Sequence, residues 1–290
     1  MNEPVRGSKP VLVSKPVRVS KPGPSPAWPV KIATAPVNFG IYSVRNPFIS
    51  AAEYSRISAD CGYEGTDLGP FGYLDEVLTP AGPALAGGWH DLRFGQEDGF
   101  AEDLAALDDT ARLLHANNRF PDMSSFAPKP TLACPPSGPL DAAGWGLLVR
   151  QAYRAASRCR EHGLEPVFHH HLDTSIETPD DIDRLLELTE LELCLDTGHL
   201  IAAGGDPLAT LRRWGHRVRH VHVKDALPDG TFCRLGAGSL DLEAFLVTLR
   251  ALDYEGWIVV EQDVPDGGQD LGGIIADMRH NREVLSGLGL

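Results

Sequence analysis

Residues 191–199 read LELCLDTGH, a short apolar run that ends in metal-binding side chains. The pattern recurs in three other segments, which read VFHHH at 167–171, VRHVHVKD at 218–225 and IVVEQD at 258–263. A short, nearly continuous apolar run is typical of a parallel strand buried on both faces. A barrel of parallel strands brings its carboxyl ends to one rim, so we expect these distant polar groups to converge there.

Apolar runs alternate with amphipathic stretches from residue 31 onward, which favours a mostly parallel α/β sheet. Eight such repeats permit closure into a TIM (β/α)8 barrel, which we predict for residues 29–290. An open doubly wound sheet is the main alternative, but the first strand leads into PVNFG rather than into a glycine-rich phosphate loop. The predicted strands are 31–35, 63–68, 85–92, 123–127 (weak), 166–170, 191–196, 218–223 and 257–261. The predicted helices are 51–60, 99–116, 142–161, 179–188, 207–214, 240–252 and 271–285.

The first 28 residues differ from the rest in composition. They contain the tripeptide Ser-Lys-Pro three times, at 8–10, 14–16 and 20–22, with almost no apolar mass. Such a segment cannot offset its ordering entropy by burial. We therefore expect a disordered, partly polyproline tail, with docking through its basic residues as the alternative.

Charge and composition exclude several classes of protein. The chain has 290 residues, is 42% hydrophobic and carries a net charge of -14. Residues 1–28 hold five basic side chains against one glutamate, so the remainder is near -18 and would repel nucleic acid. No apolar run approaches the roughly 20 residues that span a bilayer, and no secretory signal is evident. The five cysteines are widely spaced without a CxxC pair, so we expect a cytoplasmic protein without disulfides.

Four residues at successive strand ends are candidate ligands for one divalent cation: His169, Asp196, His222 and Glu261. Their separations each match about one strand and helix unit, and mixed sets of imidazole and carboxylate suit such cations. Strand alternation also places His171 on the same side as His169. We favour His169 as the ligand because it directly ends the apolar run, and His171 stays open as the alternative.

Several of these stretches resemble the xylose isomerase-like barrel superfamily of sugar isomerases, epimerases, type IV endonucleases and dehydratases. The likeness rests on GYEGTDLGP at 62–70, HHHLDT at 169–174, LDTGH at 195–199 and RVRHVHVKD at 217–225, and it is strongest to the inosose (2-keto-myo-inositol) dehydratase branch. This resemblance implies a lyase that dehydrates a keto-cyclitol through an enediolate. It also implies one divalent ion, manganese or cobalt before zinc or magnesium, on Asp196, His222 and Glu261. His169 stands where many members have glutamate.

We assign the proton transfers of this chemistry to His199 or His171, oxyanion stabilisation to Lys224, and the orientation of that lysine to Asp225. The expected partner is a small polyhydroxylated keto substrate, and a homodimer is a reasonable default. Epimerases of the superfamily use two opposed glutamates that both bind the metal. The histidine at position 169 removes this symmetry, which favours elimination.

Three segments depart from the dehydratase pattern. Residues 38–43 replace a Trp-Gly turn, Asp67 stands where glutamate is usual, and the proline-rich segment 117–136 interrupts the fourth strand. All three would line the substrate side, so substrate identity is less determined than metal binding. The alternatives are a ketose or cyclitol isomerase or epimerase, a non-catalytic barrel that binds sugar or metal, and an endonuclease on abasic DNA, which the acidic charge disfavours.

Overall fold

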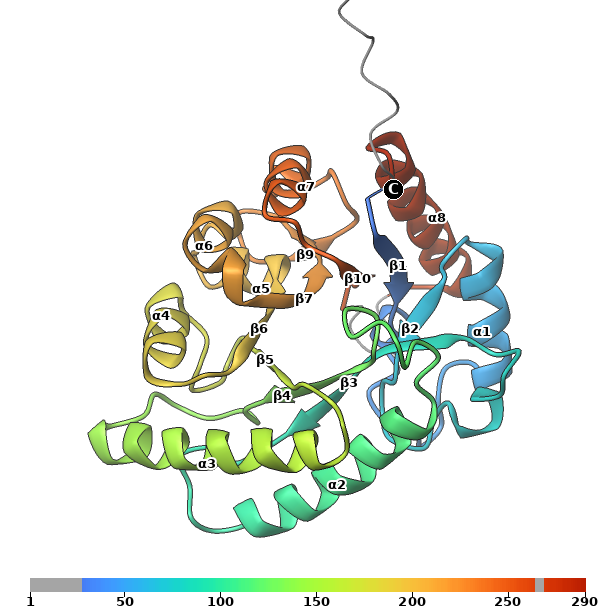
Figure 1. The fold of residues 1–290 in the computed structure, drawn as a ribbon. Helices are drawn as coiled ribbons and strands as arrows, with labels where there is room; N and C mark the ends of the chain where they lie inside the picture. The colour runs from blue at the N-terminus through green and yellow to red at the C-terminus, as the bar shows by residue number, and fades with distance from the viewer. Residues whose placement is uncertain (1–27, 264–268) are drawn as a thin grey trace, which may run out of the picture.

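The computed structural model describes residues 28–263 and 269–290, so all but the last residue of the predicted tail lies outside the described residues. Eight parallel strands form a closed barrel in the order β1-β2-β3-β4-β5-β6-β7-β10, with helices around its outside (Figure 1). This confirms the predicted (β/α)8 barrel. The barrel strands are β1 (Val30–Thr34), β2 (Gly65–Asp67), β3 (Ala84–Asp91), β4 (Lys129–Ala133), β5 (Val167–His169), β6 (Glu192–Asp196), β7 (Val218–Val223) and β10 (Gly256–Val260).

Every described α-helix except α2, which begins at Gly99, starts at a side chain that caps its first turn. Thr178 and Asp181 form a reciprocal capping box at the start of α4, and the predicted cap Asp206 accepts a hydrogen bond from the backbone of Leu208 at the start of α6. The α-helices are α1 (Ala51–Asp60), α2 (Phe100–Ala116), α3 (Ala142–Glu161), α4 (Pro179–Leu188), α5 (Thr197–Ala202), α6 (Pro207–Trp214), α7 (Leu242–Ala251) and α8 (Leu271–Gly287). Short 3-10 helices are η1 (Pro36–Phe39), η2 (Asp75–Val77) and η3 (Gly215–Arg217).

The fourth strand is the one strand that we placed wrongly. We predicted it at 123–127, whereas β4 is Lys129–Ala133 and pairs in parallel with both β3 and β5. Pro130 obscured this strand in the sequence, although a proline near the start of a strand costs little pairing. The apolar side chain of Phe126 is instead buried against the ring of Trp257, and the backbone carbonyl of Phe126 accepts a hydrogen bond from Trp257 Nε1 at 2.9 Å.

Two short elements at the carboxyl ends of strands were not predicted. Helix α5 follows β6 directly, and a hairpin of β8 (Asp225–Ala226) and β9 (Phe232–Cys233) follows β7. Both contain too few residues to show a hydrophobic period in the sequence. They bring side chains over the same end of the barrel as the predicted ligands, so they complete the walls of the candidate site.

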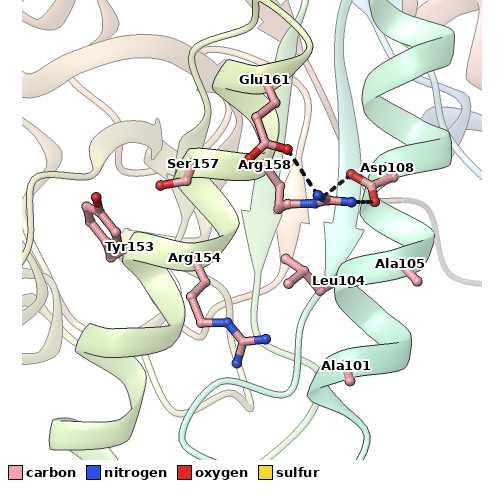
Figure 2. Close-up of a pocket in the computed structure, with 9 residues that line it drawn as sticks. All are labelled: Ala101, Leu104, Ala105, Asp108, Tyr153, Arg154, Ser157, Arg158 and Glu161. Carbon is pink, nitrogen blue, oxygen red and sulfur yellow. Dashed lines mark hydrogen bonds and ion pairs between the residues drawn. The ribbon is translucent and has the colours of Figure 1, made fainter.

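The outer layer has a hollow of its own, between α2 and α3 (Figure 2). This hollow measures about 430 Å³, and Arg158 pairs there with Asp108 and Glu161. It lies on the outer face of the helices, away from the strand ends and from the four predicted ligands. Among the described helices, none is both long and apolar enough to cross a membrane.

Candidate metal centre

The carboxyl ends of the strands open into a pocket of about 580 Å³. The predicted ligands His169, His222 and Glu261 line it, together with the apolar rings of Trp89 and Phe232. The ligands reach one pocket because a barrel places the ends of all its parallel strands at the same rim. The pocket therefore joins a polar floor to apolar walls.

Asp196 is fixed at the end of β6 because it is also the first cap of α5. Its Oδ1 accepts the backbone N–H of His199 at 2.9 Å. Its Oδ2 is fully buried and has no hydrogen-bond partner among the described residues. This oxygen lies 3.2 Å from Nζ of Lys224, 3.4 Å from Nε2 of His169 and 3.7 Å from Nδ1 of His222. Helix capping thus leaves one carboxylate oxygen for a cation.

His222 connects Asp196 with the end of β10. Its Nδ1 lies 3.1 Å from Oε2 of Glu261. Burial lowers the pKa of His222, but the neighbouring Cys194, Glu261 and Asp67 outweigh it and hold that pKa well above its usual value. A cation that binds Nδ1 would therefore replace a proton, since a metal ligand must be the neutral imidazole.

These residues fit a divalent cation. Ligand atoms of Asp196, His222 and Glu261 all lie within 4.8 Å of one another. Two atoms bound at about 2.1 Å to a common ion lie roughly 3 to 3.5 Å apart, close to the spacings observed here. Both ring nitrogens of His169 and of His222 also lack hydrogen-bond partners among the described residues. A buried polar atom without a partner is costly, and a shared cation would satisfy several of them together.

The two candidate histidines that follow β5 occupy different parts of the site. His169 lies beside Asp196 and His222, with its ring centroid 4.9 Å from that of His222. His171 lies away from them, and its ring is 3.8 Å from that of His199. Burial, and then the neighbouring His199, lower the pKa of His171 to about 4. His171 is thus a neutral imidazole at pH 7, in a position to meet a substrate.

Lys224 is fully buried at the centre of the carboxylates. Its Nζ lies 3.2 Å from Oδ2 of Asp196, 3.2 Å from Oε2 of Glu261 and 2.6 Å from Oδ2 of Asp263. Although burial lowers the Lys224 pKa, these three carboxylates outweigh the effect and raise it above the usual value. A Cβ at position 198 would lie 2.5 Å from the lysine Cγ, so Gly198 leaves the space for its stem.

We expected Asp225 to orient Lys224, but its carboxylate binds backbone groups elsewhere. Its carboxylate accepts backbone N–H groups of Ala226, Gly236, Gly238 and Leu240 at 2.9 to 3.0 Å. These bonds hold the loop that follows the β8–β9 hairpin. The short contact with the lysine ammonium belongs instead to Asp263, which follows β10.

Three further side chains shape the site, and of these we had expected only Asp67 on the substrate side. The ring of Trp89 lies 4.9 Å from that of His169, and the ring of Phe232 lies 5.0 Å from Nζ of Lys224. Asp67 contacts His222 from the opposite side of the ring. Asp67 was visible in the sequence as a departure from the usual glutamate, whereas an isolated aromatic residue carries no comparable signal.

Comparisons with known proteins agree with the barrel fold. A family model described as "Xylose isomerase-like TIM barrel" matches residues 101–284. An inosose dehydratase of Geobacillus kaustophilus is 29% identical over 280 residues, covering 81% of this chain and 88% of that protein. The rhizopine catabolism protein MocC of Rhizobium meliloti is 32% identical over 231 residues, covering 70% of this chain and 71% of its own length.

Solved structures share the fold at low identity. The IOLI protein with a bound zinc atom superposes with a TM-score of 0.70 at 13% identity, over 89% of this chain and 97% of its own. A probable 3-DHS dehydratase, AsbF of Bacillus anthracis, gives 0.68 at 14% identity, over 88% and 98% of the two chains. The family match agrees with the closed barrel and with its converging strand ends. The chain therefore belongs to the xylose isomerase-like TIM barrel family.

Proposed function

We propose that this protein is a metal-dependent lyase that dehydrates a keto-cyclitol, as the inosose dehydratases to which it is similar are named to do. The observation that carries the proposal is the convergence of Asp196, His222 and Glu261 on one point beside a buried lysine. His169 completes the ligand set. We favour manganese or cobalt as the ion. Zinc, which the structural neighbour IOLI binds, and magnesium are alternatives.

The chemistry needs an acidified C–H, a base and an acid. A bound divalent ion would polarise the substrate ketone and so make the neighbouring C–H more acidic. Nδ1 of His171 donates a hydrogen bond to the carbonyl of Leu172 at 2.8 Å, which leaves the lone pair on Nε2 free to accept that proton. Lys224 donates hydrogen bonds to the substrate oxygen on which negative charge develops.

Loss of water then requires a proton for the departing hydroxyl. His199 is the candidate donor, because the ammonium of Lys224 donates a hydrogen bond to its Nε2 at 3.1 Å and can replace the proton that the ring gives to the hydroxyl. The C–H bond breaks to His171, the C–O bond breaks as the hydroxyl takes a proton from His199, and a C=C bond forms between the two carbons. Trp89 and Phe232 would limit the access of bulk water to this step.

The alternative is an isomerase or epimerase of a ketose or cyclitol, which would share the first proton abstraction. An L-ribulose 3-epimerase has the same fold, with a TM-score of 0.68 at 14% identity. We favour elimination because His169 occupies the place of one of the two opposed glutamates that superfamily epimerases use. A cytoplasmic location and a homodimer are further parts of this proposal.

The test is to incubate the metal-loaded protein with inososes and ketohexoses in D2O and to analyse the products by mass spectrometry. Elimination predicts a product lighter by one water, together with ultraviolet absorbance from an enone or dione. Removal of the ion with a chelator should abolish this activity, and its return should restore it. Deuterium incorporation without loss of water would support the epimerase instead, and full activity of the chelated protein would refute both.

A further inference from the structure

The side chain of Asp67 lies against the nitrogen of His222 that faces away from the other ligands. Its Oδ2 is 3.1 Å from Nε2 of His222, whereas Nδ1 of the same ring is 3.1 Å from Glu261. Oδ1 of Asp67 is 3.6 Å from Nε2 of His220. All these groups are at least nine-tenths buried, so the charge of the carboxylate acts on the ring with little screening by water.

The local backbone of β2 directs this carboxylate into the barrel. The pairing of β2 with β3 shifts register between Thr66 and Asp67, and such irregularities redirect the side chain that follows. Gly87 pairs with Asp67, and a Cβ at that glycine would lie 3.1 Å from Oδ1. A larger residue at position 87 would crowd the carboxylate. The position of Asp67 therefore depends on two features of the neighbouring backbone.

A carboxylate beside one nitrogen of an imidazole influences whether the other nitrogen carries a proton or a lone pair. The anion of Asp67 lies 3.1 Å from Nε2 of His222, and its negative charge favours the tautomer with the proton on that nitrogen. The lone pair is then on Nδ1, the nitrogen directed at Asp196 and Glu261. The negative charge also makes Nδ1 a stronger donor to a cation, as carboxylates behind metal-bound histidines do in general.

We propose that Asp67 is a positioning residue that sets His222 to bind the divalent ion through Nδ1. This inference rests on the ligand set of the proposed function and extends it to a residue of β2. It explains why an acid stands in the interior of the barrel at this position. Asp67 contacts His222 and His220 and is not part of the group formed by Asp196, His222 and Glu261, so its effect on the ion would pass through the imidazole of His222.

One competing arrangement gives Asp67 a direct role. Ligand atoms of Asp67, His220 and His222 lie within 4.8 Å of one another and could hold a second cation. In that case His222 would bind an ion through Nε2, and the chain would take up two ions. The positioning role requires one ion, with a proton on Nε2.

The experiment measures binding of Mn²⁺ and Zn²⁺ to the full chain by titration calorimetry. The variants are Asp67→Leu, which removes the acceptor, and Asp67→Asn, which keeps an acceptor oxygen without charge. We expect one ion per chain in each protein. Affinity should fall about 10- to 100-fold in Asp67→Leu and by less in Asp67→Asn. Thr110→Val is the matched control, because it removes a buried hydroxyl on α2 and should leave ion affinity unchanged.

A spectroscopic readout needs no variant. In the zinc-loaded protein, nitrogen-15 NMR of the ring should show His222 bound through Nδ1 with a proton on Nε2. Zinc on Nε2, two ions per chain, or affinities of both Asp67 variants within about threefold of the unchanged protein would each overturn the inference. Neither measurement uses a substrate, so a failed dehydratase assay would leave them unaffected.

Discussion

Replacement of Lys224 by methionine tests whether the lysine ammonium compensates the negative charge of the carboxylates in the site. Methionine keeps the volume of the stem, and Gly198 still leaves room for it, while the ammonium is lost. In the ion-free protein this leaves Asp196, Glu261 and Asp263 close together without the cation that now lies within 3.2 Å of each. We expect the substitution to destabilise the ion-free protein and to strengthen ion binding.

The size of the effect follows from burial. Lys224 and Asp196 are fully buried, and removal of one partner from a buried ion pair costs about 3–5 kcal/mol. For a chain of this size that cost corresponds to a fall in Tm of roughly 6–20 °C. The ammonium and a bound ion also compete for the same oxygens of Asp196 and Glu261. Removal of this competition should raise ion affinity by about tenfold or more, a gain of at least about 1.4 kcal/mol.

The assay compares thermal unfolding of the ion-free and Mn²⁺-loaded proteins and measures Kd by calorimetry. The rise in Tm on ion binding should be larger in Lys224→Met than in the unchanged protein, because the ion replaces the missing charge. Lys129→Met is the matched control for ion binding, because it makes the same substitution at a second buried lysine, at the amino end of β4, and should leave Kd and the rise in Tm on ion binding unchanged. An ion-free Lys224→Met protein with unchanged Tm and unchanged Kd would refute the reasoning.

Three other substitutions test the ligands and the core. Asp196→Ala should abolish both ion binding and turnover, and metal analysis that still finds a full equivalent of ion would contradict its assignment. His169→Glu should keep one ion per chain, since a carboxylate can replace the imidazole, and loss of the ion would indicate a misassigned strand end. Burial lowers the pKa of Lys129 from 10.5 to about 8, so the folded chain binds fewer protons than the unfolded chain between these values. Stability should therefore rise with pH across that window. Lys129→Met should gain about 3 kcal/mol at pH 7 and lose this pH dependence in urea unfolding, whereas unchanged stability would contradict it.

Much of the barrel was predictable because parallel strands buried on both faces leave continuous apolar runs. The strand and helix that precede the site, β6 and α4, lie within one residue of their predicted bounds. The strand around Pro130 was not predicted correctly, because it contains a lysine and a proline, while the apolar residues that precede it in the sequence pack elsewhere. Prediction from local sequence pattern fails where tertiary packing decides which of two adjacent segments becomes the strand.

Some residues of the candidate site could likewise be predicted from the sequence, and others could not. Asp196, His222 and Glu261 could be named from the sequence because each follows a recognisable strand. The contact between Asp67 and His222 could not be named, since β2 and β7 are not neighbours in the sheet and the two side chains meet across the barrel interior. The short contact of Asp263 with Lys224 was equally hidden, because it depends on the path of the chain after β10.

By itself, the sequence determined the repeating strand and helix pattern, the closed barrel and the strand ends that carry imidazole and carboxylate groups. These follow from local periodicity and from the common direction of parallel strands. Only the tertiary structure decided which nitrogen of His222 faces Glu261, which of His169 and His171 lies beside Asp196, and which acid holds Lys224. Those choices depend on distances of 3 to 4 Å between residues remote in the chain, which strand spacing alone cannot specify.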